Sequence, residues 1–182
     1  GYDFATFEQN ADIERARTRV AEAIREKEKD YSLCRMVAGF TWEWKTKRMS
    51  GDEIAKNHAY DIDIEGHHYL WNTTDRDWIN SINSINEIGC IHTTQGFDLN
   101  YAGVIIGPEL DYDPKTNKLF VIKERYKDLL GKARTRTGKD LEKYIFNIYR
   151  TLLARGIRGT FIYACNPELR KYLNLFIPVI KH

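Results

Sequence analysis

The sequence has 182 residues, of which 42% are hydrophobic, 13% aromatic and 30% charged, and this composition excludes a disordered, collagen-like or coiled-coil chain. The length is typical of one domain, so we expect residues 1–182 to form a single domain. With 28 Lys and Arg against 26 Asp and Glu, the formal net charge is +2, and total charge alone therefore indicates neither nucleic acid nor a membrane surface as a partner.

The first part of the chain predicts a helix, a buried strand and a hairpin. Residues 12–29 carry apolar side chains at three- and four-residue spacing, which is typical of an amphipathic helix. Residues 33–41 form an apolar run and predict a strand that is buried on both faces. Residues 60–72 alternate around Glu65-Gly66, and because a Gly in a two-residue connection tolerates positive φ, we expect a β-hairpin insertion there.

The later elements are predicted from the same kinds of pattern. Residues 87–93 and 102–107 predict two more buried strands, with a turn at Gln95-Gly96 between them. The polar segments 111–118 and 131–138 predict loops, the second of them exposed. We also expect a short helix at 126–130, a helix capped by Asp140 that ends near Gly156, a strand at 160–165, and a last helix from Pro167 to about Phe176.

Buried strands that do not alternate, joined by helices, indicate a mostly parallel sheet that is covered on both faces. The expected fold class is therefore α/β, a three-layer α/β/α sandwich with a small β-hairpin insertion. Ligands of such sheets collect at the carboxyl ends of the strands, which places the segments after Thr41, Thr93 and Gly107 on the functional edge.

Features of the whole sequence indicate a cytoplasmic protein. Its longest apolar runs, such as 102–107, are far shorter than the roughly 20 residues of a membrane helix, so no membrane partner is expected. The chain begins with Gly, and its first 30 residues mix acids and bases, which indicates a piece of a longer protein without a secretory signal. The 3 Cys residues are widely spaced and odd in number, which favours buried reduced thiols over disulfides or a zinc site.

The sequence lacks the usual phosphate-binding loop. The nearest candidate, 131–140, has six residues between its two Gly where a Walker A motif has four, and Asp140 stands where Ser or Thr would bind Mg²⁺. It also lacks a GxSxG elbow, an HExxH helix and paired CxxC motifs, and we expect no metal site.

The segment 89–98 (GCIHTTQGFD) brings polar side chains to the end of a buried strand. Gly96 allows a phosphate to approach the backbone closely, and the hydroxyls of Thr93 and Thr94 can donate to a nucleic-acid phosphate. The alternative is a polar turn that ends the strand, with His92 as a core histidine.

A second candidate segment is 147–159 (NIYRTLLARGIRG), where Arg150, Arg155 and Arg158 follow closely at a helix end. An Arg held on a partly buried helix has the rigidity of an arginine finger, the side chain that stabilises charge on a transferring γ-phosphate. The alternative is that these cations balance the helix dipole.

Taken in order, these segments resemble the carboxyl-terminal part of the Schlafen group 3-like DNA/RNA helicases, which are related to superfamily 1. The resemblance runs from about Leu33 to Cys165. It is carried by RMVAGFTWEW, the YDIDI hairpin with Trp71-Asn72, EIGCIHTTQGFDLNYAGVIIGPEL and YRTLLARGIRGTFIY. It implies the second RecA-like P-loop NTPase lobe of a two-lobed, ATP-driven helicase or translocase. The first lobe, which would carry Walker A and B, is missing from this sequence.

The resemblance also implies roles for individual residues. GCIHTTQGFD is similar to helicase motif V and YRTLLARG to motif VI. The resemblance places Gln95 and Gly96 near the γ-phosphate, and Asp98 near the ribose or the metal, where the family usually has Glu. It makes Arg155 the arginine finger, with Arg158 as a weaker candidate. Thr93 and Thr94 would face DNA or RNA. ATP and Mg²⁺ would bind to the full-length protein. The fragment alone is expected to be inactive and to hold neither tightly.

Local charge is compatible with a nucleic-acid partner. Between Lys115 and Lys143, Lys and Arg exceed Asp and Glu by ten to four, so the rest of the chain is net negative. We expect DNA or RNA, preferably single-stranded, to be contacted by Arg134, Arg136 and Lys139. A merely solvated loop explains the charge pattern equally well.

Aromatic side chains and a buried Arg complete the candidates. Trp42, Trp44, Trp71 and Trp78 can stack on bases, but large aromatics more often fill a core. Arg35 is expected to make an internal ion pair. The alternative function is a nucleic-acid or protein interaction module on the same scaffold without ATP coupling, since Asp98 departs from the family pattern.

Overall fold

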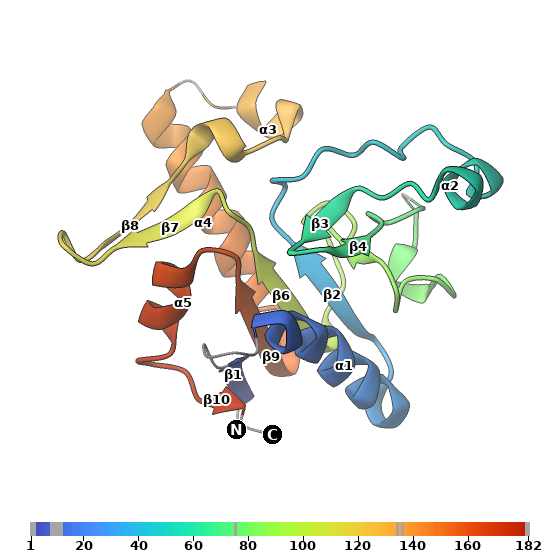
Figure 1. The fold of residues 1–182 in the computed structure, drawn as a ribbon, viewed down its shortest axis with the longest axis horizontal. Coiled ribbons are helices and arrows are strands. Elements are labelled where there is room, and N and C mark those ends of the chain that lie inside the picture. Colours follow the sequence, from blue (N-terminus) through green and yellow to red (C-terminus); the bar gives the residue numbers. More distant parts are fainter. Residues whose placement is uncertain (1–2, 8–12, 75, 134, 136, 181–182) are drawn as a thin grey trace.

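The computed structural model describes residues 3–7, 13–74, 76–133, 135 and 137–180. Within these ranges six strands form one sheet in the order β10-β1-β9-β6-β2-β5, and every pairing between neighbours is parallel (Figure 1). The strands are β1 (Asp3–Phe7), β2 (Cys34–Ala38), β5 (Ile88–Gly89), β6 (Leu99–Ile106), β9 (Gly156–Ala164) and β10 (Val179–Ile180).

Helices cover both faces of the sheet. On one face lie α1 (Ile13–Tyr31) and the hairpin of β3 (Ile62–Ile64) and β4 (His67–Tyr69). On the other face lie α4 (Gly138–Leu153) and α5 (Pro167–Leu173). Figure 1 shows α1 in front of the sheet and α4 behind it. The predicted three-layer α/β/α sandwich with a hairpin insertion is thus confirmed, and the fold is that of a RecA-like lobe.

The core consists of two apolar clusters, one on each face. Val20, Ala21 and Ile24 of α1 pack with buried residues of β2 and of the hairpin. Leu141, Ile145, Ile148 and Leu152 of α4 pack against the opposite face. These α4 positions recur every three or four residues, so the buried stripe of the helix is the one its sequence predicts.

The observed bounds of β2, β5, β6 and β9 differ from those predicted, and the contacts of β5 and β9 explain their differences. β5 ends at Gly89 rather than at residue 93, because the backbone turns at once: the amide of Cys90 donates to Thr93 Oγ1 over 3.0 Å, and the hydroxyl of Thr94 donates to the Cys90 carbonyl over 3.2 Å. β9 begins at Gly156, earlier than the predicted 160, since its first residues pair with the start of β6.

The prediction of a loop at 111–118 is wrong. The chain instead forms a second hairpin of β7 (Leu110–Asp113) and β8 (Lys118–Val121). The carboxylate of Asp113 closes its turn, since it accepts from the amide of Lys115 and the hydroxyl of Thr116. Turn-forming polar residues therefore connect two strands here.

The helices near the carboxyl-terminal third also need correction. Asp140 does not cap α4; Thr137 does, and Asp140 is the third helical residue of a capping box whose carboxylate accepts from the Thr137 amide. The expected helix at 126–130 is replaced by η2 (Lys123–Arg125) and α3 (Leu129–Ala133), so part of the expected exposed loop is helical. α5 ends at Leu173. The short elements α2 (Gly51–Asn57) and η1 (Trp78–Asn80) lacked a sequence prediction, and so did the strands β1 and β10.

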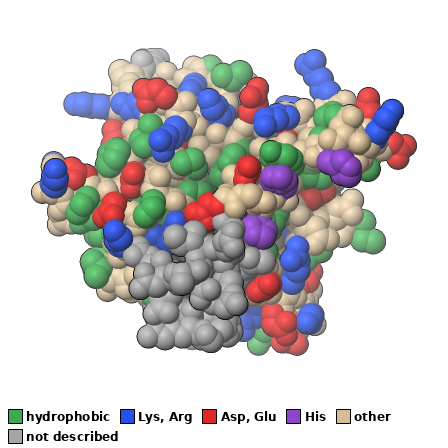
Figure 2. Space-filling model, viewed as in Figure 1, with side chains coloured by type: hydrophobic (Ala, Val, Ile, Leu, Met, Phe, Trp, Pro, Cys, Tyr) green, Lys and Arg blue, Asp and Glu red, His purple; other side chains and the backbone are tan. Residues whose placement is uncertain are grey.

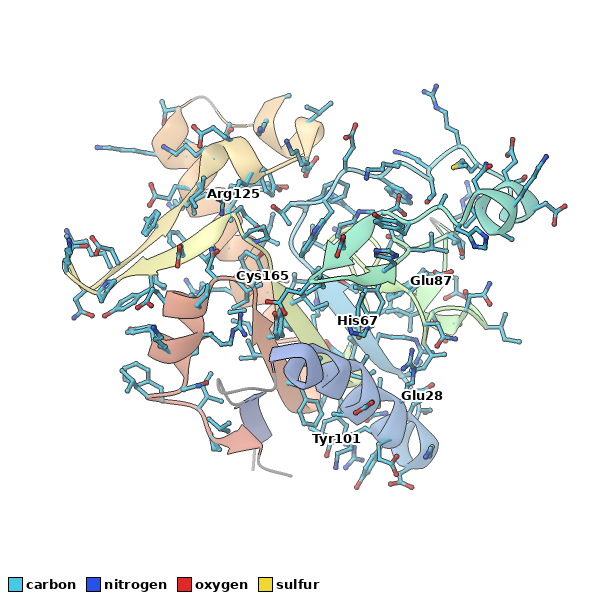
Figure 3. The ribbon with its side chains drawn as sticks, viewed as in Figure 1. Glu28, His67, Glu87, Tyr101, Arg125 and Cys165 are labelled. Carbon is cyan, nitrogen blue, oxygen red and sulfur yellow. The ribbon has the colours of Figure 1, made fainter. Side chains whose placement is uncertain are left out.

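Two buried polar side chains of the core, Arg35 and Trp78, have partners from their own chain. Arg35 lies 2.9 Å from Glu28 of α1 and donates to the carbonyl of Ile79, which confirms the expected internal ion pair. Trp78 is fully buried and its indole N–H donates to Glu87. Glu28 and Glu87 are labelled in Figure 3. Trp71 is also fully buried, so Trp71 and Trp78 fill the core rather than stack on bases.

The 3 cysteines are free thiols. Burial raises the pKa of Cys34 to about 11, and it raises the pKa of Cys90 as well, so both stay protonated near neutral pH. None of the helices in the described ranges has the length and apolarity that crossing a bilayer requires.

Candidate functional site

The segment 90–98 runs from the side of the sheet where the strands end to the side where they begin. It leaves the carboxyl end of β5 and enters the amino-terminal end of β6. Residues 91–96 form consecutive turns, and Gly96 has φ +85°, a backbone conformation that favours glycine. No heavy atom lies within 4 Å of the position that a Cβ would take at Gly96, so this backbone is open to a ligand.

The two predicted nucleic-acid contacts in this segment differ in accessibility. Thr93 is half-buried, and its hydroxyl donates to the Cys90 carbonyl over 3.1 Å. Thr94 is fully buried, and its hydroxyl is used inside the turn. A fully buried side chain cannot touch a nucleic acid in this conformation. We therefore assign Thr94 to holding the turn and keep Thr93 as a candidate nucleic-acid contact.

Arg155 lies between the end of α4 and the start of β9. Its carbonyl accepts from the amide of Leu99 over 2.9 Å, which ties the helix end to the segment before β6. Its Nη1 donates to the Phe97 carbonyl over 3.3 Å and lies 3.8 Å from Asp98 Oδ1. The side chain of Arg155 is 20% exposed, whereas that of Asp98 is 67% exposed. Among the described residues, buried Arg155 Nε has no hydrogen-bond partner.

Gln95 and Arg155 line one groove. This groove, which we call the α4 groove, has a volume of about 320 Å³ and lies between the turns at 91–96 and the outer side of α4. Its lining includes His92, Gln95, Tyr144, Asn147, Thr151 and Arg155. A neighbouring hollow of about 460 Å³ is lined by Arg150 and Arg155. The sequence places these residues in two separate segments, and the fold brings them together.

The α4 groove is not confined to the carboxyl edge of the sheet, where the sequence analysis expects the whole site. His92 follows β5 and so lies at the carboxyl edge, whereas Arg155 directly precedes β9 and lies at the amino-terminal edge. The groove runs along the flank of α4 between them, because segment 90–98 crosses the sheet there.

Arg158 does not line the α4 groove. It is a residue of β9 and not of the preceding helix, which corrects the expectation that it stands with Arg150 at a helix end. Its Nε donates to Asn100 over 3.1 Å, and its guanidinium lies 4.8 Å from the ring centroid of Tyr31. These contacts indicate a structural role, so we drop Arg158 as a second finger.

His92 is exposed rather than a core histidine. Its side chain is 46% exposed, and its Nε2 lies 3.4 Å from Asp128 Oδ2. Asp128 is itself buried, and it accepts from the hydroxyl of Tyr126 and the amide of Gly131. His92 therefore stands at the surface, held near a fixed carboxylate.

A second hollow lies beyond His92, at the carboxyl ends of β2 and β5. It has a volume of about 590 Å³, and its lining includes Phe40, Trp44, Lys47, His92, Thr93 and Lys127. We call it the Trp44 pocket. Lys47 and Lys127 were not predicted because they come from distant segments, although the aromatic residues at 40, 42 and 44, followed by basic residues at 45, 47 and 48, were an available signal.

The predicted basic contacts are only partly described. Arg134 and Arg136 lie outside the described residues. Lys139 is exposed in the first turn of α4, at the opposite end of the helix from Arg155 and, at 1.5 Å per residue, about 20 Å away. In Figure 2 Lys and Arg side chains stand out along the upper edge of the molecule, over α3 and the segment between β2 and α2.

No metal centre is assembled within the described ranges, where no three His, Cys, Asp or Glu side chains come together. Asp98, which precedes β6, places one exposed carboxylate 3.8 Å from Arg155 Nη1.

The parallel sheet, its two helical layers and the α4 groove define a RecA-like α/β lobe. The family model that matches residues 3–166 is described as "Schlafen group 3, DNA/RNA helicase domain", and the chain belongs to this family.

A curated relative extends the comparison. The chain is 35% identical over 159 residues to an uncharacterized protein of Saccharomyces cerevisiae, YPL245W. The aligned region is 84% of this chain and 34% of that protein, so the chain spans about a third of the length of the curated relative it matches. No solved structure matches the chain.

Proposed function

We propose that this chain is the second RecA-like lobe of an ATP-dependent DNA/RNA helicase or translocase. It would supply the loop around Gln95 and the finger Arg155 to an ATP site whose Walker A and B motifs belong to another lobe. The observation that carries this proposal is the α4 groove, in which Gln95 and Arg155 face a common space although 60 positions separate them in the sequence.

The α4 groove has the properties that a phosphate group requires. Arg155 Nε is a buried donor without a partner among the described residues, and Nη1 makes only the long contacts to Phe97 and Asp98. Arg150 adds a second cation in the adjoining hollow. The open backbone at Gly96 leaves room beside them. These groups suit the terminal phosphates of ATP, and Gln95 and Arg155 would hold them.

Bound ATP would supply the phosphoryl group and the negative charge that develops on it during transfer. The role of Arg155 is to stabilise that charge, since a guanidinium in a partly buried groove acts through a lower effective dielectric than one in water. The backbone bond between Leu99 and Arg155 fixes the base of this side chain. Arg155 therefore needs little reorganisation to point into the groove.

Segment 90–98 offers a path from this groove to a nucleic acid. Thr93 lines the Trp44 pocket on one side of the segment, and Gln95 lines the α4 groove on the other. When two lobes close on a nucleotide, a displacement of Gln95 is transmitted to Thr93 through two intervening peptide units. Lobe closure would in this way shift the contact with a single strand.

The test is steady-state ATP hydrolysis by the complete protein, with Arg155→Ala compared with Arg158→Ala. Loss of a finger lowers kcat by roughly 10³-fold or more. Arg158→Ala removes a neighbouring guanidinium outside the α4 groove and should keep kcat within about twofold of the wild type. An Arg155→Ala enzyme within about twofold of the wild type would end the assignment.

The contact between Arg155 and Asp98 favours a second candidate, an interaction module that keeps the RecA-like scaffold without ATP coupling. A carboxylate 3.8 Å from the guanidinium competes with phosphate for it. In that case the complete protein would bind single-stranded nucleic acid in a salt-dependent way, and its affinity would not change when ATP is added.

A further inference from the structure

The Trp44 pocket joins aromatic surface to positive charge at the carboxyl ends of β2 and β5. Trp44 and Phe40 follow β2, and His92 and Thr93 follow β5. Lys127 is fixed beside them, because its amide donates to the Phe40 carbonyl over 2.8 Å. The volume of about 590 Å³ is in the range of sites that bind small organic groups.

Two ammonium groups at this pocket are not neutralised within the described part of the chain. No ion pair there engages Lys47 or Lys127, and both side chains are exposed. The acids of the pocket are placed differently: Asp128 is buried and bound by Tyr126 and Gly131, and Glu43 is exposed. The lysines therefore remain available to an anion that approaches from solvent.

The aromatic side chains are not all used by the core. Phe40 stacks on buried Trp71 with ring centroids 5.2 Å apart, and it closes the floor of the pocket. Trp44 is half-buried, and Lys47 Nζ lies 5.1 Å from the centroid of its ring. The π-face of Trp44 attracts the ammonium group of Lys47. A planar group that stacks on this ring would displace the ammonium group toward negative charge carried by the same ligand.

We infer that the Trp44 pocket binds one base of a single-stranded nucleic acid by stacking on Trp44, while Lys47 and Lys127 contact the flanking phosphates. This inference rests on the proposed function, since it gives the strand a defined place beside Thr93. Stacking on an aromatic ring accepts every base, so the site takes a strand without sequence preference. Uncharged small molecules would use the ring but leave both lysines without a partner.

The experiment measures binding of fluorescent oligo(dT) and oligo(U) to the chain without ATP, over a series of salt concentrations. Trp44→Ala should weaken binding by about 5- to 150-fold, the range found for loss of one stacked base. Lys47→Gln and Lys127→Gln should each lower the slope of log affinity against log salt by about 0.7. The two oligonucleotides distinguish DNA from RNA as the source of the strand.

Matched variants separate binding from folding. Lys45→Gln removes the same charge two positions from Lys47, but Lys45 lies over the ring of Tyr60 and outside the Trp44 pocket, so its slope should stay that of the wild type. Trp44→Phe keeps a ring and should lose less than fivefold in affinity, yet it should lose the quenching of intrinsic fluorescence on binding. Trp42→Phe should keep that quenching. Thermal unfolding of each variant checks the fold.

Each outcome decides the inference. Equal affinities of Trp44→Ala, Lys127→Gln and the wild type would overturn it, as would a wild-type chain that binds neither oligonucleotide. The proposed function is judged separately by ATP hydrolysis of Arg155→Ala. A pocket confirmed here together with an unaffected Arg155→Ala enzyme would retain the strand site and reject the motor.

Discussion

Arg155 is held by the segment that precedes β6: its Nη1 lies 3.3 Å from the Phe97 carbonyl oxygen and 3.8 Å from the carboxylate of Asp98. Both contacts are long, and Asp98 is mostly exposed, so this pair contributes little to stability. The arrangement points the guanidinium toward the α4 groove without fixing it tightly. Arg155 is thus positioned by its own chain and still free to take another partner.

Substitution of Asp98 tests what its carboxylate does. If it contacts the ribose, Asp98→Ala should raise KM for ATP by about 2- to 10-fold, the range expected for one hydrogen bond. Asp98→Glu, which keeps the carboxylate and lengthens the side chain by one methylene, should lower KM. Steady-state kinetics of the complete protein gives both values. A lower KM for Asp98→Ala would show instead that the carboxylate competes with phosphate for Arg155.

The fold was largely predictable because its buried elements have strong patterns. The largely apolar run of β2, the helical stripe of α4 and the alternation around Glu65-Gly66 each correspond to an observed element. The hairpin of β7 and β8 was not predicted, because only Leu110 of its two strands is buried and they lack the apolar pattern of a core strand.

The candidate site was predictable in part. Gln95 and Arg155 were found from motifs, and the fold brings both to one groove. The burial of Thr94 was not foreseen, because a hydroxyl suits a turn and a phosphate equally well, and spacing does not distinguish the two. Lys127 was missed as part of a pocket because only the three-dimensional fold places it beside Phe40.

Glu109 predicts a pH dependence of stability. Burial raises the pKa of its carboxyl, although the hydroxyl of Tyr149 donates to it, and Oε2 has no hydrogen-bond partner among the described residues. Because the folded pKa lies above the unfolded one, the folded state binds more protons, and stability falls as pH rises from the ordinary pKa of about 4.3 toward the raised value.

Glu109→Gln removes this pH dependence, because an amide does not titrate. The amide oxygen of Gln can still accept the hydrogen bond from Tyr149. Urea unfolding should show the variant to be more stable than the wild type at pH 7, with the difference shrinking toward pH 4. Glu109→Ala is the control for lost packing and should be less stable than Glu109→Gln throughout. Parallel pH profiles for wild type and Glu109→Gln would contradict this account.

The buried ion pair of Arg35 predicts a cost for removing one partner. Arg35→Ala removes the guanidinium donors of the Ile79 carbonyl, which keeps only the hydroxyl of Ser84, and it leaves Glu28 without its cation. Loss of one partner of a buried pair costs about 3–5 kcal/mol. Since Glu28 is 27% exposed, we expect the lower end, about 3 kcal/mol. Urea unfolding measures it. Arg35→Met, which keeps the side-chain volume, should lose less, and equal losses would attribute the effect to the lost ion pair and hydrogen bonds alone.

The last prediction concerns the close packing that sets the start of the site segment. A Cβ at Gly89 would lie 2.4 Å from Cζ3 of Trp78, whose indole is fixed by Glu87, so the ring cannot move away freely. Gly89→Ala should therefore destabilise the fold by about 1–3 kcal/mol, as overpacking does. Gly51→Ala is the matched control, because nothing lies within 4 Å of its Cβ and it begins α2, where Ala should be neutral or stabilising. Urea unfolding of both variants gives the comparison, and because β5 leads directly into Cys90 and the following turns, Gly89→Ala should also weaken binding of a single strand at Thr93. Equal stabilities of the two variants would show that the Trp78 ring yields and does not hold the site segment in place.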